Sequence, residues 1–146
     1  MKNKRIRPLA ICVFQNQGRI LVNQSYDPAK DEYFYRPLGG GIEFGEISMD
    51  TVCRELKEEL DIEVERESLR YLGTLENMFT FLGKPHHEII LIYDGALKES
   101  GLYDQAVILG REANGEEIRA EWRSIAEFDE GRSILYPTGL RELLRT

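Results

Sequence analysis

Three glutamates crowd one short segment of this sequence. Glu55, Glu58 and Glu59 lie within the stretch "CRELKEEL" at residues 53–60. On a helix these positions are related as i, i+3 and i+4, so the three carboxylates project from one face. Their mutual repulsion costs roughly 0.2–0.5 kcal/mol per pair. A solvated acidic face is the simplest explanation for three glutamates alone, so the residues around them must decide whether the face is a binding site.

A glycine-rich bend, Gly39–Gly41, precedes the acidic segment and changes this interpretation. A hard cation such as Mg²⁺ prefers carboxylates together with waters and substrate phosphate oxygens. Because glycine carries no Cβ, an ion or a phosphate can approach its backbone closely. The combination favours a cation site, and the cation would allow an acidic chain to bind an acidic substrate.

One amphipathic helix must position these carboxylates. Ser48 is expected as its N-cap, and Asp50 lies in its first turn. Val52, Leu56 and Leu60 recur at four-residue spacing and are expected to form its buried stripe.

The remaining patterns predict one α/β domain with a mixed β-sheet over residues 1–146. Two apolar runs flank an Asn/Gly turn and predict a hairpin, which a polar loop at 26–33 follows. Residues 110–117 are expected to be a loop with little regular structure. The expected strands are 9–14, 19–25, a short strand from 34 that runs into the glycine bend at 39–41, 69–81, 86–97 and 118–125, and the expected short helices are 125–131 and 138–146.

The composition excludes several classes of protein. The chain has 146 residues, of which 42% are hydrophobic and 31% charged, as in ordinary globular domains. Its net charge of −7 argues against a nucleic-acid polymer as partner, because the phosphates would be repelled. Cys12 and Cys53 are too few for a disulfide scaffold and indicate a reducing compartment. The apolar run before Gln15 is too short for a signal core or a membrane span, so a cytoplasmic location without a membrane partner is expected.

The segment from Gly40 to Ile62 resembles the signature of the Nudix hydrolase family, G-x5-E-x7-R-E-U-x-E-E-x-G-U, where U is a bulky apolar residue. Every specified position matches at the required spacing except Asp61, where the family has Gly. That glycine is expected to be a left-handed helix C-cap, a conformation that Asp tolerates better than most residues. The resemblance implies the family's α/β/α sandwich with a mixed sheet.

The resemblance also implies an activity and its cofactor. Family members cleave a nucleoside diphosphate linked to another moiety, by attack of water on a phosphorus, and they use Mg²⁺ or Mn²⁺. Carried over to this sequence, Glu58 and Glu59 would be the main metal ligands, with Glu55 ligating or orienting and the Gly39 carbonyl completing the set. Arg54 would hold the glutamates by ion pairing, and Glu46 would brace the loop against the helix.

Other site residues follow less directly. The general base would come from the signature or from the loop before "EW", where Glu116 is favoured slightly over Glu117. Arg36 is a candidate for a phosphate contact, and Gly40 for close approach of the substrate. Phe34 or Tyr35 is a candidate for stacking on a base or sugar, although strand packing is the simpler role for either ring.

The substrate and the assembly stay open at this point. The proline and tyrosine that mark two family subgroups are absent near Asn77 and Met78, and no arginine stands at the end of the second expected strand. A small nucleoside diphosphate derivative is therefore the narrowest partner that the resemblance implies. The alternative function is a non-catalytic, nucleotide-sensing module of the same fold. Family members are often dimers, which makes a homodimer a further expectation.

Overall fold

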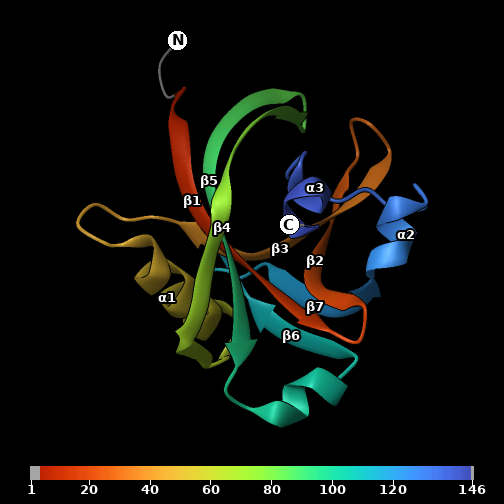
Figure 1. The fold of residues 1–146 in the computed structure, drawn as a ribbon. Coiled ribbons are helices and arrows are strands. Elements are labelled where there is room, and N and C mark those ends of the chain that lie inside the picture. The colour runs from red at the N-terminus through yellow and green to blue at the C-terminus, as the bar shows by residue number, and fades with distance from the viewer. Residues whose placement is uncertain (1–3, 146) are drawn as a thin grey trace.

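A curved sheet of seven strands organises the chain in the computed structural model, which describes residues 4–145 (Figure 1). The strands are β1 (Ile6–Asn16), β2 (Arg19–Asp27), β3 (Glu32–Gly41), β4 (Val64–Phe81), β5 (Lys84–Leu97), β6 (Val107–Arg111) and β7 (Glu117–Ser124). The helices are α1 (Ser48–Leu60), α2 (Ile125–Asp129) and α3 (Leu140–Leu144), with a 3₁₀ turn, η1, at Ser100–Asp104.

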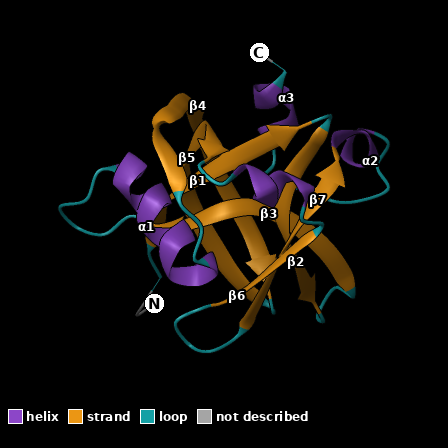
Figure 2. Cartoon of the chain, turned by 90° about the horizontal axis from the view of Figure 1, so that it is seen from below, coloured by secondary structure: helices purple, strands orange, loops and turns teal. Residues whose placement is uncertain are grey.

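The sheet is mixed, as the sequence predicted. Its strand order is β4-β5-β1-β3-β2-β7-β6, and β1 pairs with β5 in parallel while the other neighbours are antiparallel. Helix α1 lies on one side of the strands, and α2 and α3 lie on the other (Figures 1 and 2). Two hydrophobic clusters fill these two layers. The predicted α/β/α arrangement is therefore confirmed.

Strand β3 changes partner half-way along its length. Its first half pairs with β2 up to Pro37, and its second half pairs with β1 from Leu38 to Gly41. The predicted glycine bend, Gly39–Gly41, is thus part of a strand, and the bend follows it. A Cβ on Gly39 would lie 2.1 Å from the Ala10 carbonyl oxygen, so only glycine permits this close pairing.

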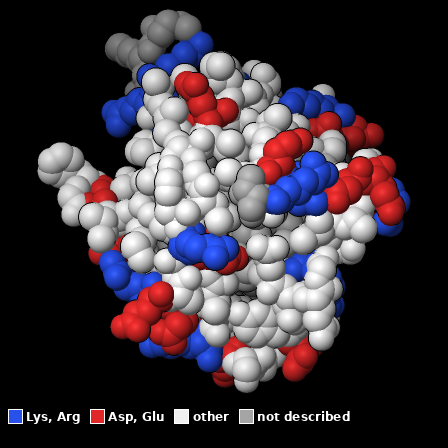
Figure 3. Space-filling view, in the orientation of Figure 1, with Lys and Arg blue, Asp and Glu red and all other residues white. Residues whose placement is uncertain are grey.

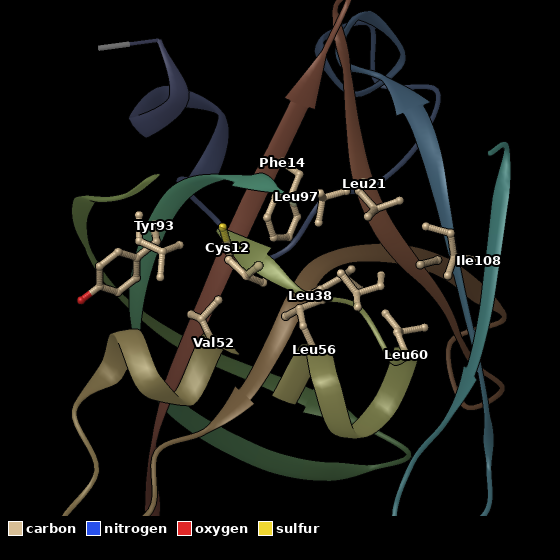
Figure 4. Packing of buried hydrophobic residues seen from close by; sticks show 14 of the residues in the cluster. Cys12, Phe14, Leu21, Leu38, Val52, Leu56, Leu60, Tyr93, Leu97 and Ile108 are labelled. Atoms are coloured by element: carbon tan, nitrogen blue, oxygen red, sulfur yellow. The ribbon is translucent and has the colours of Figure 1, made fainter. Parts of the chain in front are cut away.

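The predicted stripe of α1 is confirmed. Val52, Leu56 and Leu60 are buried and point into the cluster between α1 and the sheet (Figure 4). The prediction of Ser48 as N-cap is wrong: the helix is capped by Ile47, without a side-chain hydrogen bond. The Ser48 hydroxyl instead shares a 2.6 Å hydrogen bond with the Tyr93 hydroxyl, because the first turn of α1 packs against β5.

The end of α1 agrees with the prediction for its one unusual residue. Asp61 adopts the left-handed conformation, with φ 54° and ψ 39°, and its backbone N–H bonds to the carbonyls of the last helical turn. Its carboxylate lies 2.8 Å from Lys57 Nζ. The aspartate therefore occupies the geometric position that the family's glycine would hold.

Some expected loops contain more structure than predicted. β2 and β3 extend into the expected loop at 26–33, and η1 and β6 occupy residues that had no predicted element. On the face shown in Figure 3, positive and negative side chains gather in small mixed groups with broad uncharged areas between them. Among residues 4–145, no helix is both long and apolar enough to cross a bilayer.

Candidate active site

A cleft of about 470 Å³ opens beside the glycine-rich end of β3. Its size falls in the range of small-molecule sites. Helix α1, the loop after β6, and the faces of strands β1, β2, β3 and β5 contribute to its walls. The charged residues that line it are Arg7, Arg36, Glu55, Glu59, Glu88 and Glu112.

One wall of the cleft is acidic. Glu55 and Glu59 reach it from α1, and Glu112 reaches it from the loop that follows β6. The Glu55 carboxylate sits directly over the glycine strand, since a Cβ on Gly40 would lie 2.4 Å from the carboxyl carbon of Glu55. Gly40 is therefore required for Glu55 to occupy this place.

Arg54 ties the acidic face to the preceding loop. Its Nη1 donates to Glu55 Oε1 at 2.9 Å and to Glu58 Oε2 at 3.3 Å. Its Nε donates to Glu46 Oε2 at 2.7 Å, and its Nη2 donates to Glu46 Oε1 and to the Gly41 carbonyl. The ion pairs expected of Arg54 are thus present. The bond from Arg54, with a second one from Thr51, lowers the pKa of Glu46 to about 2.

The pKa values of two glutamates in the acidic wall are raised. Burial, followed by the negative charges of Glu55, Glu112 and Glu58, raises the pKa of Glu59 to about 7. Burial also raises the pKa of Glu55, although the hydrogen bond from Arg54 opposes the shift. Such shifts are typical of functional clefts, because a structural surface would disperse the charges.

The donor set of this wall fits a hard divalent cation. Glu55, Glu59 and Glu112 offer carboxylate oxygens beside the exposed backbone of the glycine strand, and their crowding is what a cation would relieve. Within residues 4–145, however, no three acidic, histidine or cysteine side chains converge on one point as metal ligands would. Glu58 lies on the Arg54 guanidinium, and its side chain is 60% exposed.

The structure brings together only part of the predicted site. Glu55, Glu59, Gly39, Gly40 and Arg36 line the cleft, whereas Phe34, Tyr35, Glu58 and Glu116 are not among its lining residues. Tyr35 is buried in the layer beneath α2 and α3, and its ring packs edge-on against Phe128. Phe34 is buried at a separate cavity of only about 10 Å³, far too small for a nucleobase. Neither ring is placed to stack on a ligand in the cleft.

Three residues of the cleft were missed by sequence reasoning: Arg7, Glu88 and Glu112. The turn between β6 and β7 closes with a hydrogen bond from the Glu112 N–H to the Glu116 carbonyl. Both glutamates are exposed, and of the two only Glu112 lines the cleft. A predicted strand at 107–111 would have been the signal for Glu112, because it fixes where the turn begins.

Comparison with known proteins shows the family to which the chain belongs. A family model described as "NUDIX domain" matches residues 4–143. Among solved structures, the chain is similar to a MutT NUDIX hydrolase from Burkholderia pseudomallei, with 20% identity, a TM-score of 0.63, and coverage of 97% of this chain and 98% of that chain. The chain is also similar to the MutT protein from Methanosarcina mazei Go1, with 16% identity, a TM-score of 0.60, and coverage of 99% of this chain and 94% of that chain.

A structure described as an ADP compounds hydrolase is also similar, with 18% identity, a TM-score of 0.60, and coverage of 98% of this chain and 73% of that chain. None of the curated proteins gives a significant match. Structural likeness at such identities shows the fold, while the family match spans most of the chain. The chain therefore belongs to the Nudix family of hydrolases.

Proposed function

We propose that this chain is a metal-dependent pyrophosphohydrolase that cleaves a nucleoside diphosphate linked to another moiety, by attack of water on a phosphorus. The observation that carries the proposal is the cleft itself, where a wall of crowded carboxylates faces Arg36 across a space large enough for a small ligand. A bound diphosphate needs positive charge and hydrogen-bond donors around its phosphate oxygens. A cation held by the carboxylates would neutralise one phosphate, and Arg36 would donate to the other.

The metal ligands proposed for Mg²⁺ or Mn²⁺ are the carboxylates of Glu55, Glu58 and Glu59 with the carbonyl of Gly39. When bound, such a cation polarises the phosphoryl oxygens and lowers the pKa of the attacking water. Glu58 must leave its 3.3 Å contact with Arg54 to take part. Its exposure makes this exchange inexpensive, since a solvated ion pair contributes little.

The chain's own residues divide the remaining tasks. Arg54 is a positioning residue, because it donates to Glu55 and to the Gly41 carbonyl and so fixes the helix against the glycine strand. The general base was left open between the signature and the loop before "EW", with Glu116 slightly favoured, and we now propose Glu112 for this role. It is the loop carboxylate that lines the cleft beside Glu59.

The test is hydrolysis of a panel of nucleotide sugars and dinucleotides, with Mg²⁺, with Mn²⁺ and with EDTA. The phosphomonoester products are separated by chromatography, because cleavage of the diphosphate bond releases no inorganic phosphate by itself. We expect turnover that requires the cation. Glu58→Gln should abolish it with an unchanged melting temperature, and Glu112→Gln should lower kcat by about 10²-fold or more. Glu67→Gln, an exposed glutamate on β4, is the matched control and should behave as the wild type.

Near-normal activity of Glu58→Gln would contradict the ligand assignment. Tight nucleotide binding without turnover on any member of the panel would support the alternative of a sensing module. A cytoplasmic location, a homodimer and the lack of a nucleic-acid partner stay predictions from the sequence.

A further inference from the structure

The second wall of the cleft contains a buried carboxylate between two arginines. The Glu88 side chain, on β5, is only 2% exposed. Arg36 Nη2, on β3, donates to Glu88 Oε1 at 2.8 Å, and Arg7 Nη1, on β1, lies 3.7 Å from Glu88 Oε2. All three residues line the cleft opposite the carboxylates of α1. None of them belongs to the family signature.

The backbone fixes these three side chains relative to one another. Arg7 and Glu88 are direct neighbours in the parallel pairing of β1 with β5. Arg36 comes from the part of β3 that pairs with β2. A buried carboxylate is costly unless it is paired, so Glu88 holds the Arg36 guanidinium in one orientation instead of letting it turn to solvent.

The two arginines keep spare capacity for a ligand. Each guanidinium has five N–H donors, and Arg36 uses one of them on Glu88. No further hydrogen bond of the Arg36 side chain is found among residues 4–145, and its guanidinium carbon lies 5.8 Å from the centre of the Phe79 ring. Arg7 is 59% exposed, and its Nη1 is beyond hydrogen-bond distance of Glu88. Two positive charges against one carboxylate leave this wall with a net charge of +1, in a chain whose net charge is −7.

The arginine wall and the acidic wall both adjoin the glycine-rich end of β3. A Cβ on Gly41 would lie 3.6 Å from Arg7 Nη2, and a Cβ on Gly40 would lie 2.4 Å from the carboxyl carbon of Glu55, so the two groups approach successive residues of the glycine strand. Both groups line the same cleft, together with the neutral polar side chains Asn23 and Ser25. A ligand with two linked phosphates has a second phosphate to place beside the arginines when the first lies at the carboxylates, whereas a single phosphate has none.

We propose that Arg7 and Arg36, positioned by Glu88, form a phosphate subsite that binds without a metal ion. The proposal rests on the pyrophosphohydrolase function proposed above and adds a substrate requirement to it. The subsite takes a phosphate group of the substrate that is not the one neutralised at the carboxylate wall. Bidentate guanidinium–phosphate contacts suit it, because the planar fork of arginine matches two phosphate oxygens.

The probe that tests the subsite is inorganic pyrophosphate, titrated calorimetrically in EDTA so that no divalent cation takes part. The wild type should bind it. Arg7→Met should weaken binding by about ten-fold or more, since a lost hydrogen bond to a charged group has this effect. Arg70→Met, which removes an exposed arginine of β4 that does not line the cleft, is the matched control and should bind as the wild type.

Arg36 needs a paired variant, because Arg36→Met alone would leave Glu88 buried without its partner. The double variant Arg36→Met/Glu88→Met replaces the pair by apolar side chains and should fold. We expect it to bind pyrophosphate at least ten-fold more weakly than the wild type. Affinity equal to the wild type in the double variant or in Arg7→Met, or no binding by the wild type in EDTA, would overturn the proposal.

The variant Glu88→Gln tests whether Glu88 acts by positioning Arg36 or only by adding negative charge to the cleft. If Glu88 only adds negative charge to the cleft, its neutralisation should strengthen pyrophosphate binding. If it positions Arg36, binding should weaken despite the lost negative charge, and we expect this weaker binding. Stronger binding would refute the positioning role.

The two proposals can fail separately. Binding of pyrophosphate in EDTA without metal-dependent turnover on the nucleotide panel would count against the hydrolase proposal alone. Turnover by Arg7→Met with an unchanged KM would count against the subsite alone.

Discussion

Gly110 of β6 is the point where the loop carrying Glu112 is held against α1. A Cβ built on Gly110 would lie 2.0 Å from the Glu59 carbonyl oxygen and 2.7 Å from Leu60 Cδ2. The first contact is with helix backbone, which cannot rotate out of the way. Gly110→Ala must therefore separate β6 from the end of α1, and with it move Glu112 from Glu59.

The size of the effect follows from this clash. Overpacking a well-packed interior costs about 1–3 kcal/mol, and we expect the upper end, about 3 kcal/mol, because the obstacle is backbone. In a domain of this size about 1 kcal/mol shifts the melting temperature by roughly 3 °C, so a fall of about 9 °C is expected. Displacement of a catalytic group by about 1 Å can lower the rate by roughly 10²-fold. We therefore expect kcat to fall by about this factor at a temperature at which the variant is still folded.

The assay compares thermal melting, urea denaturation and turnover on the best substrate of the nucleotide panel. Gly101→Ala is the control, because a Cβ there would meet no atom within 4 Å. It should melt and turn over as the wild type. A Gly110→Ala protein with wild-type melting and wild-type kcat would refute both the packing and the link between β6 and the cleft.

Three further predictions concern other parts of the fold. Asp61→Gly should raise the melting temperature by about 3 °C, because glycine adopts the left-handed C-cap without strain, and a lower value would contradict this. Burial raises the pKa of Glu127, but hydrogen bonds led by Arg123 outweigh it and hold that pKa below its usual value. The stabilisation is therefore present above the unfolded pKa of about 4.3 and is lost as the pH falls below it, so the urea midpoint of Glu127→Gln should change less between pH 5 and pH 3 than that of the wild type. Arg36→Met should lower the free energy of unfolding by about 3 kcal/mol, because it leaves the buried Glu88 carboxylate without its partner, whereas the double variant with Glu88→Met should lose close to none. Urea denaturation measures both values, and equal losses would show that burial of Glu88 does not depend on Arg36.

The helix and its chemistry could be predicted because their information is local. Val52, Leu56 and Leu60 recur with the helical period, so the buried face of α1 follows from the sequence alone. The left-handed conformation of Asp61 was expected because the family signature has glycine at this position, and the structure confirms it. The N-cap was harder to predict, because the Ser48 hydroxyl had a distant partner, Tyr93, that no local pattern reveals.

The placement of aromatic rings depended on contacts between distant segments. Alternation along β3 shows that Phe34 and Tyr35 point to opposite sides, but it does not show what covers each side. The chain near its C-terminal end covers both. Leu135 forms an isolated parallel β-bridge with Tyr35. The centres of the Tyr136 and Phe34 rings are 5.3 Å apart. These contacts bury the two rings and remove them from the cleft.

The two walls of the cleft differ in how the sequence encodes them. The acidic wall is mostly carried by one helix, so its carboxylates are close in sequence, and the glycines and the signature around them pointed to a cation site. The basic wall is assembled from β1, β3 and β5, and its residues meet only because β1 lies between β5 and β3 in the sheet. No periodicity connects Arg7, Arg36 and Glu88, and a buried glutamate is indistinguishable from a surface glutamate in a sequence. A family signature therefore points to the residues of the acidic wall, while the arginines that we propose to bind a phosphate lie on strands whose pairing only the fold reveals.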